Sequence, residues 1–181
     1  MSNLYLLLGG NEGDRQQILT AATGLIRERV GSVVACSQMY ESAPWGRFDK
    51  AETPSFLNMA VQVATELGAV ECLRACQEIE RELGRQRRGD ETATSGARVY
   101  SSRPIDIDLM LYDDEVIALP ELTIPHPRMQ VRRFVLLPLN DIAPRVIHPV
   151  LKKSISQLLS ECEDCCFCCV YCCSPLPQGR S

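Results

Sequence analysis

Lysine is scarce in this sequence, and long apolar runs are absent from it. Only three of the 19 basic residues are lysines, and the other 16 are arginines. No stretch of roughly 18 or more consecutive apolar residues occurs, which excludes a membrane-spanning helix. The N-terminus also lacks the basic segment and the cleavage site of a secretory signal. We therefore expect a cytoplasmic protein with no membrane partner.

An excess of positive charge is also missing. The formal net charge of the 181-residue chain is −4, whereas nucleic-acid-binding domains carry a basic field. We therefore expect no nucleic-acid partner. The predominance of arginine still favours phosphate recognition, because the planar guanidinium binds phosphate oxygens through two hydrogen bonds. A GC-rich coding bias would give the same composition, and composition alone does not separate the two explanations.

Several nucleotide-binding and catalytic motifs are absent as well. The apolar run 4–8 leads into Gly9-Gly10-Asn11, but no Walker lysine follows and the G-x-G-x-x-G spacing is not present. We interpret the glycine pair as a structural turn. No convincing Ser-His-Asp or Cys-His set is found, so the sequence offers no covalent nucleophile.

Residues 103–112, RPIDIDLMLY, are the most informative stretch. Apolar residues at every second position predict a strand with one face in the core. Asp106 and Asp108 then share the other face, with Cα atoms roughly 6.5–7 Å apart. Aspartate is a poor strand former and like charges repel, which a bound divalent cation would explain. Magnesium, held by one or two carboxylates and substrate phosphates, fits best, and the alternative is a solvated strand face.

The order of the predicted elements is β-α-β-β-α-β. This pattern is typical of ferredoxin-like α+β folds, in which helices pack on the faces of an antiparallel sheet. Asp14 is the predicted N-cap of the first helix. The chain length predicts one domain, at residues 1–160, with an appendage at 161–181. The predicted strands are residues 4–8, 32–41, 56–65, 103–112 and 115–119, and the predicted helices are residues 15–30, 69–83 and 134–139.

Two loops are candidates for ligand binding. The loop after residue 41 carries the only tryptophan, Trp45, which is either a core plug or part of a ligand lid. Residues 84–102 exceed the length of about 12–15 residues beyond which loops are usually functional or disordered. An arginine cluster opens this loop, so we interpret it as a mobile phosphate clamp and not as a solvated charge run. His126, between two prolines, is either a turn residue bound by the backbone or a phosphate donor.

The C-terminal tail holds seven of the ten cysteines, between Cys162 and Cys173. In a cytosolic chain this density suggests zinc or thiolate-cluster chemistry more than disulfides. However, no histidine lies among these cysteines, and the pairs are adjacent instead of following the C-x2-C spacing. Because free cysteine also packs as a small hydrophobe, we favour an edge strand at residues 165–171 followed by a disordered end.

These stretches together resemble one enzyme family, the 6-hydroxymethyl-7,8-dihydropterin pyrophosphokinases of folate biosynthesis. The resemblance covers roughly residues 1–160 and has no counterpart for the cysteine tail. It implies a ferredoxin-like fold and the transfer of a pyrophosphoryl group from ATP to the pterin hydroxymethyl, with release of AMP. The matching stretches are LYLLLGGN (4–11), SQMYESAPWG (37–46), FLNMAV (56–61), IERELGRQRR (79–88), SRPIDIDLMLYDDEVI (102–117) and LTIPHPRMQVRRFVLLPLNDIAP (122–144).

The resemblance also implies roles for matching residues. Asp106 and Asp108 would hold two Mg2+ ions that bridge the ATP phosphates, and the pterin would lie between two phenylalanine rings. The implied catalytic residues are Arg85, Arg87, Arg103, Asp106 and Asp108. The implied ATP-binding residues are Gln77, Glu80, Arg85, Arg103, Thr123, His126 and Arg132. The implied pterin-binding residues are Ser42, Ala43, Trp45, Phe56, Asn58 and Phe134.

One alternative function belongs to a different class, a non-catalytic nucleotide-sensing or RNA-binding module on the same fold. RNA-recognition sheets carry paired aromatic residues on central strands and a basic surface. The strand at 103–112 carries aspartates instead, which disfavours this alternative. We expect a monomer whose partners are ATP and the hydroxymethyl dihydropterin. Since the implied site residues all precede the tail, we also expect truncation after Leu159 to leave turnover nearly intact.

Overall fold

Strand β1, Ser2–Gly10, has an antiparallel neighbour on each side in the computed structural model, which describes residues 1–44, 53–84 and 102–171. Its partners are β4, Phe56–Thr65, and β5, Asp106–Tyr112. Beyond β4 lie β2, Ser32–Cys36, and β3, Tyr40–Ser42, which both pair with β4. This strand order, with β1 and β4 at the centre, confirms the predicted ferredoxin-like α+β fold.

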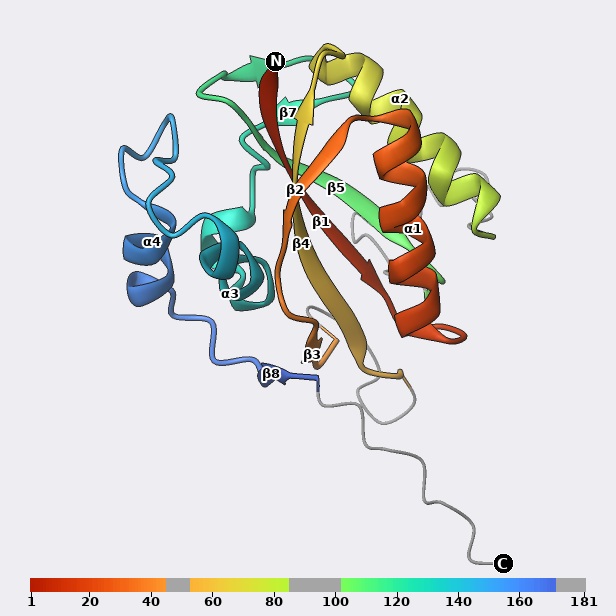
Figure 1. The fold of residues 1–181 in the computed structure, drawn as a ribbon. Helices are drawn as coiled ribbons and strands as arrows, with labels where there is room; N and C mark the ends of the chain where they lie inside the picture. The colour runs from red at the N-terminus through yellow and green to blue at the C-terminus, as the bar shows by residue number, and fades with distance from the viewer. Residues whose placement is uncertain (45–52, 85–101, 172–181) are drawn as a thin grey trace, which may run out of the picture.

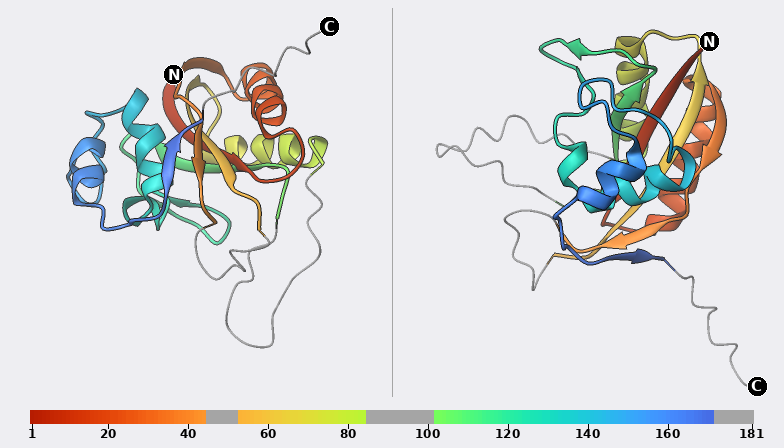
Figure 2. Two further views of the ribbon diagram at one scale, coloured as in Figure 1. Left: turned by 90° about the horizontal axis from the view of Figure 1, so that it is seen from below. Right: turned by 90° about the vertical axis from the view of Figure 1, so that its left-hand side faces the viewer.

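Helices cover both faces of the sheet (Figures 1 and 2). On one face, α1 and α2 pack over a core that includes Leu6, Ile26 and Ile79. On the other face, α3 and α4 pack over a second core that includes Met110 and Leu136. The helices are α1, Arg15–Arg29; α2, Ala69–Glu82; α3, Arg133–Ile142; and α4, Ile155–Glu161. The smaller elements are β6, Ile117–Ala118; β7, Thr123–Ile124; the 3-10 helix η1, Met129–Val131; and β8, Cys168–Val170.

Local sequence explains where α1 begins and which side it buries. Asp14 caps the helix as predicted, because its side chain accepts a hydrogen bond from the Gln17 N–H at 3.0 Å. Leu19, Ala22 and Ile26 are buried and recur at helical spacing. None of the helices within the described ranges is long and apolar enough to cross a membrane.

The strand predicted at residues 32–41 is instead two strands, β2 and β3. A register shift between Val33 and Ala35 disturbs the pairing of β2 with β4. Ser37 then bonds to Ala60 through its backbone N–H and its hydroxyl, which replaces the regular strand pairing at that point. The break lets the chain change direction before β3, whose last residues reach the candidate site.

The alternation predicted for residues 103–112 also fails near the end of β5. A register shift opposite Tyr5 and Leu6 inserts Met110 as an extra residue. As a result, Leu111 lies on the face covered by α3 and α4 and not on the face of Ile107. The shift follows both aspartates, so Asp106 and Asp108 keep the shared side that the alternation predicted.

The glycine pair ends β1 as part of the strand and not as a turn. A Cβ on Gly10 would overlap the carbonyl oxygen of Pro104, so the chain before β5 can approach β1 only at glycine. A Cβ on Gly9 would lie 2.9 Å from the side-chain oxygen of Asn58. The pair therefore allows two close contacts, one with the chain before β5 and one with Asn58, which lines the pocket described next.

Candidate active site

A pocket opens where β1, β4 and β5 meet the end of β3 and the first turn of α3. It brings together nine residues that the sequence predicted for three separate roles, in metal, phosphate and pterin binding. The predicted residues that line it are Ser42, Ala43, Phe56, Asn58, Arg103, Asp106, Asp108, Arg132 and Phe134. Leu7 and Gly9, which the sequence did not indicate, complete the lining.

Asp106 and Asp108 form the acidic side of the pocket. They lie on β5 opposite Gly9 and Leu7 of β1. Arg103 pairs with Asp106 at 3.0 Å. Burial and the neighbouring Asp106 carboxylate raise the pKa of Asp108 well above its usual range, although Arg103 lowers it. Two carboxylates that repel each other in this way suit a divalent cation as ligands, because the charge of the cation would relieve the repulsion.

Positive and donor groups lie next to the acidic pair. The Nε of Arg103 is buried and has no hydrogen-bond partner within the described part of the chain, which suits an anionic ligand. Arg132 is buried as well, and its guanidinium lies over the ring of Phe134 at 5.7 Å from the centroid. An arginine held against a ring in this way presents a fixed set of donors.

His126 is neutral in the folded protein. Burial lowers the pKa of its imidazole to about 4, and the charge of Arg132 contributes in the same direction. Its Nδ1 accepts a hydrogen bond from the Arg128 N–H at 3.2 Å, so the ring proton sits on Nε2. His126 thus makes the hydrogen bond to the backbone that was one of its two predicted roles. Because its proton is on Nε2, this nitrogen can also act as a hydrogen-bond donor.

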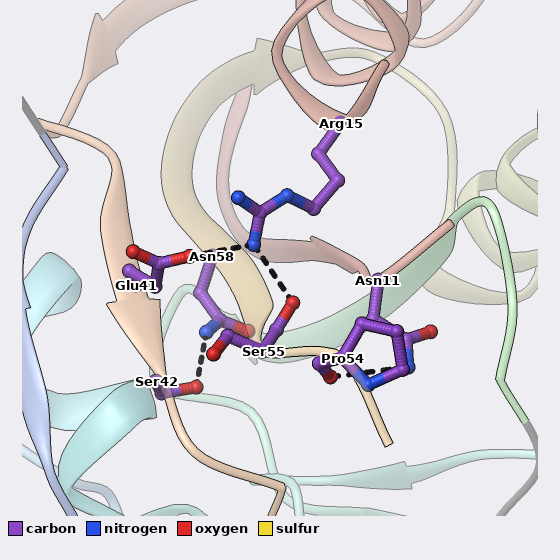
Figure 3. Close-up of polar contacts among 7 residues, drawn as sticks. All are labelled: Asn11, Arg15, Glu41, Ser42, Pro54, Ser55 and Asn58. Atoms are coloured by element: carbon purple, nitrogen blue, oxygen red, sulfur yellow. Dashed lines mark hydrogen bonds and ion pairs between the residues drawn. The ribbon is translucent and has the colours of Figure 1, made fainter. Parts of the chain in front are cut away.

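The apolar side of the pocket combines two rings with an ordered amide. Phe56 begins β4, and Phe134 lies in the first turn of α3. Asn58, two residues after Phe56, is buried and donates from Nδ2 to the hydroxyl of the buried Ser42 at 2.8 Å (Figure 3). This bond fixes which way the amide faces, so the pocket combines aromatic lining residues with an oriented polar group.

Asn11 and Arg15, which the sequence did not indicate, hold the chain around this pocket (Figure 3). Asn11 is 3% exposed, and its Nδ2 donates to Pro54 O at 3.4 Å and to Ser102 Oγ at 3.1 Å. Arg15 bonds to Glu41 and to the carbonyl of Ser55, each at 2.8 Å. The only sequence signal for this role is an asparagine directly after a buried strand. A buried amide needs several hydrogen-bond partners, so it tends to connect neighbouring segments.

Four of the predicted residues that the structure describes are not among those that line the pocket: Gln77, Glu80, Thr123 and His126. Thr123 is exposed on β7, and Gln77 is partly buried on α2. Glu80 is buried and accepts a hydrogen bond from the Ile107 N–H at 2.7 Å, which joins α2 to β5. Trp45, Arg85 and Arg87 lie outside the described residues. Roles for these seven residues, the four named first and the three outside the described ranges, in nucleotide or pterin binding stay predictions.

A protein-only metal centre is not found in residues 1–44, 53–84 and 102–171, where no group of three or more His, Cys, Asp or Glu residues is placed to hold an ion. This search includes the tail cysteines up to Cys169, which are free thiols. A cation at Asp106 and Asp108 would therefore take further ligands from a substrate, as magnesium does in phosphoryl-transfer sites.

Comparisons with known proteins give the fold and the family of the chain. The pocket combines carboxylates and arginines with two phenylalanines, a composition that suits phosphoryl transfer. The fold is similar to that of a solved Plasmodium falciparum HPPK-DHPS protein bound to pteroate, with a TM-score of 0.69 at 18% identity. The alignment covers 88% of this chain, which spans only 44% of that protein.

Sequence matches give the family. The model of the 7,8-dihydro-6-hydroxymethylpterin-pyrophosphokinase (HPPK) family matches residues 5–144, and the chain belongs to this family. The 2-amino-4-hydroxy-6-hydroxymethyldihydropteridine pyrophosphokinase of Porphyromonas gingivalis is 44% identical over 82% of this chain and 95% of the relative. The enzyme of the same name from Bacillus subtilis is 39% identical, over 81% of each chain. The chain is thus a pyrophosphokinase, which favours catalysis over the alternative of a non-catalytic binding module.

Proposed function

We propose that this chain transfers the pyrophosphoryl group of ATP to 6-hydroxymethyl-7,8-dihydropterin at the pocket described above, with Asp106 and Asp108 as ligands of two Mg2+ ions. The observation that carries the proposal is the placement of this carboxylate pair and of the Phe56 and Phe134 rings in one pocket. A flat heteroaromatic acceptor and an anionic donor would meet there. The products are AMP and the pterin diphosphate.

The acidic and basic residues act on the phosphates. Bound magnesium would neutralise phosphate charge and orient the oxygens on the transferred group. Arg103 and Arg132 bind phosphate oxygens and stabilise the negative charge that shifts during transfer. His126 donates from Nε2 to a phosphate oxygen, which a neutral imidazole does without titrating near pH 7.

The apolar side orients the pterin. Phe56 and Phe134 stack on the two faces of the ring, and Asn58, held by Ser42, forms hydrogen bonds with its polar edge. Ala43 also lines the pocket. No side chain has to form a covalent intermediate. Positioning the hydroxymethyl oxygen in line with the phosphate therefore accounts for a large share of the rate acceleration.

Further residues complete the proposal at the nucleotide and pterin subsites. Arg85 and Arg87 contribute to phosphate binding, and Trp45 contributes to pterin binding. Gln77, Glu80 and Thr123 act on the nucleotide side; for Glu80 the bond to Ile107 supports a role in positioning β5. We also infer, as expected from the sequence, that the enzyme works as a cytoplasmic monomer.

The nucleotide product tests the proposal directly. The protein is incubated with ATP, magnesium and the hydroxymethyl pterin, and the products are separated by anion-exchange chromatography. We expect AMP and the pterin diphosphate in equal amounts, and no turnover after chelation of divalent cations. ADP as the main product, or full turnover in the presence of a chelator, would contradict the proposed reaction.

A further inference from the structure

The tail segment 164–171 lies beyond the family match, which ends at residue 144, and yet it borders the pocket. Its strand β8 runs beside β3 (Figure 2) and pairs with it antiparallel. The register places Cys168 opposite Ser42. Directly after this pair, the Ala43 N–H donates to the carbonyl of Phe167 at 3.1 Å. Ser42 and Ala43 both line the pocket, so the tail holds the outer edge of the strand that presents them.

Asp164 connects the same segment to the opposite side of the pocket. Its Oδ2 accepts a hydrogen bond from the Arg133 N–H at 2.9 Å, and its Oδ1 accepts one from the Cys166 N–H at 3.0 Å. Arg133 begins α3 between Arg132 and Phe134, which both line the pocket. The helix has no side-chain cap of its own at residue 132, so Asp164 supplies the acceptor from another part of the chain.

The ionisation of Asp164 fits this role. Partial burial alone would raise the pKa of its carboxyl group. The hydrogen bonds from the Arg133 and Cys166 N–H groups outweigh that effect and lower the pKa below its usual range. The carboxylate is therefore charged at neutral pH and lies at the N-terminal end of α3, where a negative charge is favourable.

The two ends of α3 are tied to the neighbourhood of β3 by different contacts. Near its C-terminal end, Asp141 accepts hydrogen bonds from the Tyr40 hydroxyl at 2.9 Å and from the Gln38 N–H at 3.2 Å. Near its N-terminal end, the tail makes the connection. Asp164 bonds to Arg133 of α3, and Phe167 bonds to Ala43 directly after β3. The end that carries the pocket residues is thus the end that the tail positions.

The far end of the segment reaches a third side of the pocket. The ring of Tyr171 lies under the guanidinium of Arg15, 5.6 Å from its centroid. Arg15 in turn donates to the carbonyl of Ser55, which directly precedes Phe56. This segment therefore reaches the immediate neighbours of three pocket residues. It bonds to Ala43, next to Ser42, and to Arg133, next to Phe134. Through Arg15 it is also linked to Ser55, next to Phe56.

We propose that residues 164–171 are a positioning element for the pterin subsite, and that Asp164 is the positioning residue that sets Phe134 relative to Ser42 and Ala43. The inference rests on the proposed placement of the pterin in this pocket. It also replaces the expectation from the sequence that the tail is dispensable for turnover, because the contacts of Asp164 and Phe167 were not visible in the cysteine pattern.

The test compares three variants in the full-length chain. Asp164→Ala removes both hydrogen bonds, Asp164→Asn keeps an oxygen for one of them, and Glu163→Ala removes the same charge from the exposed neighbouring residue. For Asp164→Ala we expect KM for the pterin to rise about three- to tenfold, the effect of losing one or two charge-assisted bonds. We expect KM for ATP to stay close to the wild-type value, Asp164→Asn to restore part of the loss, and Glu163→Ala to match the wild type.

Two results would overturn the inference. One is a pterin KM in Asp164→Ala equal to that of Glu163→Ala. The other is an equal rise of both KM values with a loss of folded protein in thermal unfolding, which indicates a general structural role. Phe134→Ala in the same assay separates this inference from the proposed function. If Phe134→Ala raises the pterin KM and Asp164→Ala does not, the pterin site stands and only the positioning role is wrong; if neither raises it, the placement of the pterin is wrong.

Discussion

Asn11 and Arg103 bind each other in both directions across the end of β1. The Asn11 N–H donates to the Arg103 carbonyl at 3.0 Å, and the Arg103 N–H donates to the Asn11 Oδ1 at 2.9 Å. The same asparagine also holds Pro54 and Ser102 through its Nδ2. The chain before Phe56 and the chain before the aspartate strand are therefore attached to one side chain.

Replacement of Asn11 by alanine should impair both stability and substrate binding. The variant leaves the Arg103 N–H without its acceptor, and such an orphaned group typically costs about 1–3 kcal/mol when buried. For a chain of this size a loss of 1 kcal/mol lowers the Tm by roughly 2–4 °C. Calorimetry measures the Tm, and steady-state assays should show higher KM values for both substrates.

The control for this variant is Asn3→Ala. Asn3 also lies on β1 and also forms side-chain hydrogen bonds, to Asp113 and Gln62, but it is exposed. We expect it to change the Tm and both KM values little, because exposed groups regain hydrogen bonds from water. Equal effects of Asn11→Ala and Asn3→Ala would contradict the central position of Asn11.

Removal of either pocket carboxylate should abolish most of the turnover. Asn is nearly isosteric with Asp, so Asp106→Asn and Asp108→Asn keep the packing of β5 and remove one charge each. Loss of a group that stabilises transition-state charge typically costs about 10²–10³ in rate. Turnover across a magnesium titration measures the effect, and Asp114→Asn, at an exposed position just after β5, is the matched control. Wild-type rates in both variants at low magnesium would show that the pair does not bind the metal.

The metal-free protein should show opposing pH effects from two buried groups. Burial and Asp106 raise the pKa of Asp108 from 3.8 to about 7, so the folded state binds this proton more tightly than the unfolded chain. Its contribution to stability is present at low pH and is lost as the pH rises through that window. Burial and Arg132 lower the pKa of His126 from 6.5 to about 4, so its contribution is present above 6.5 and is lost as the pH falls toward 4.

Substitution separates the two contributions. In Asp108→Asn, the free energy of unfolding should rise with pH between about 4 and 6.5, because the histidine effect is left unopposed. In His126→Gln, it should fall as the pH rises from about 4 to 7. Urea unfolding in the presence of a chelator measures both slopes. Burial also lowers the pKa of His148, which adds the same upward slope with pH to both variants. The test is therefore the difference between the two slopes, and equal slopes would contradict the assignment.

Much of the site could be predicted from the sequence because its signals are local. The alternation around Asp106 and Asp108 places both carboxylates on one side of a strand, whatever the strand pairs with. The N-cap at Asp14 and the bounds of β4 likewise depend on neighbouring residues. Each of these features depends on a few consecutive residues and on the periodicity of a helix or strand, and each is present in the structure.

Tertiary structure decided what depends on pairing across the chain. The break between β2 and β3 and the extra residue Met110 in β5 arise from the register with neighbouring strands, which no local pattern gives. The several partners of Asn11 come from segments more than 40 residues away. The bond from Asp164 to α3 likewise joins segments that only the folded chain brings together, so the sequence alone determined which groups are present, and the packing of the sheet decided which of them meet.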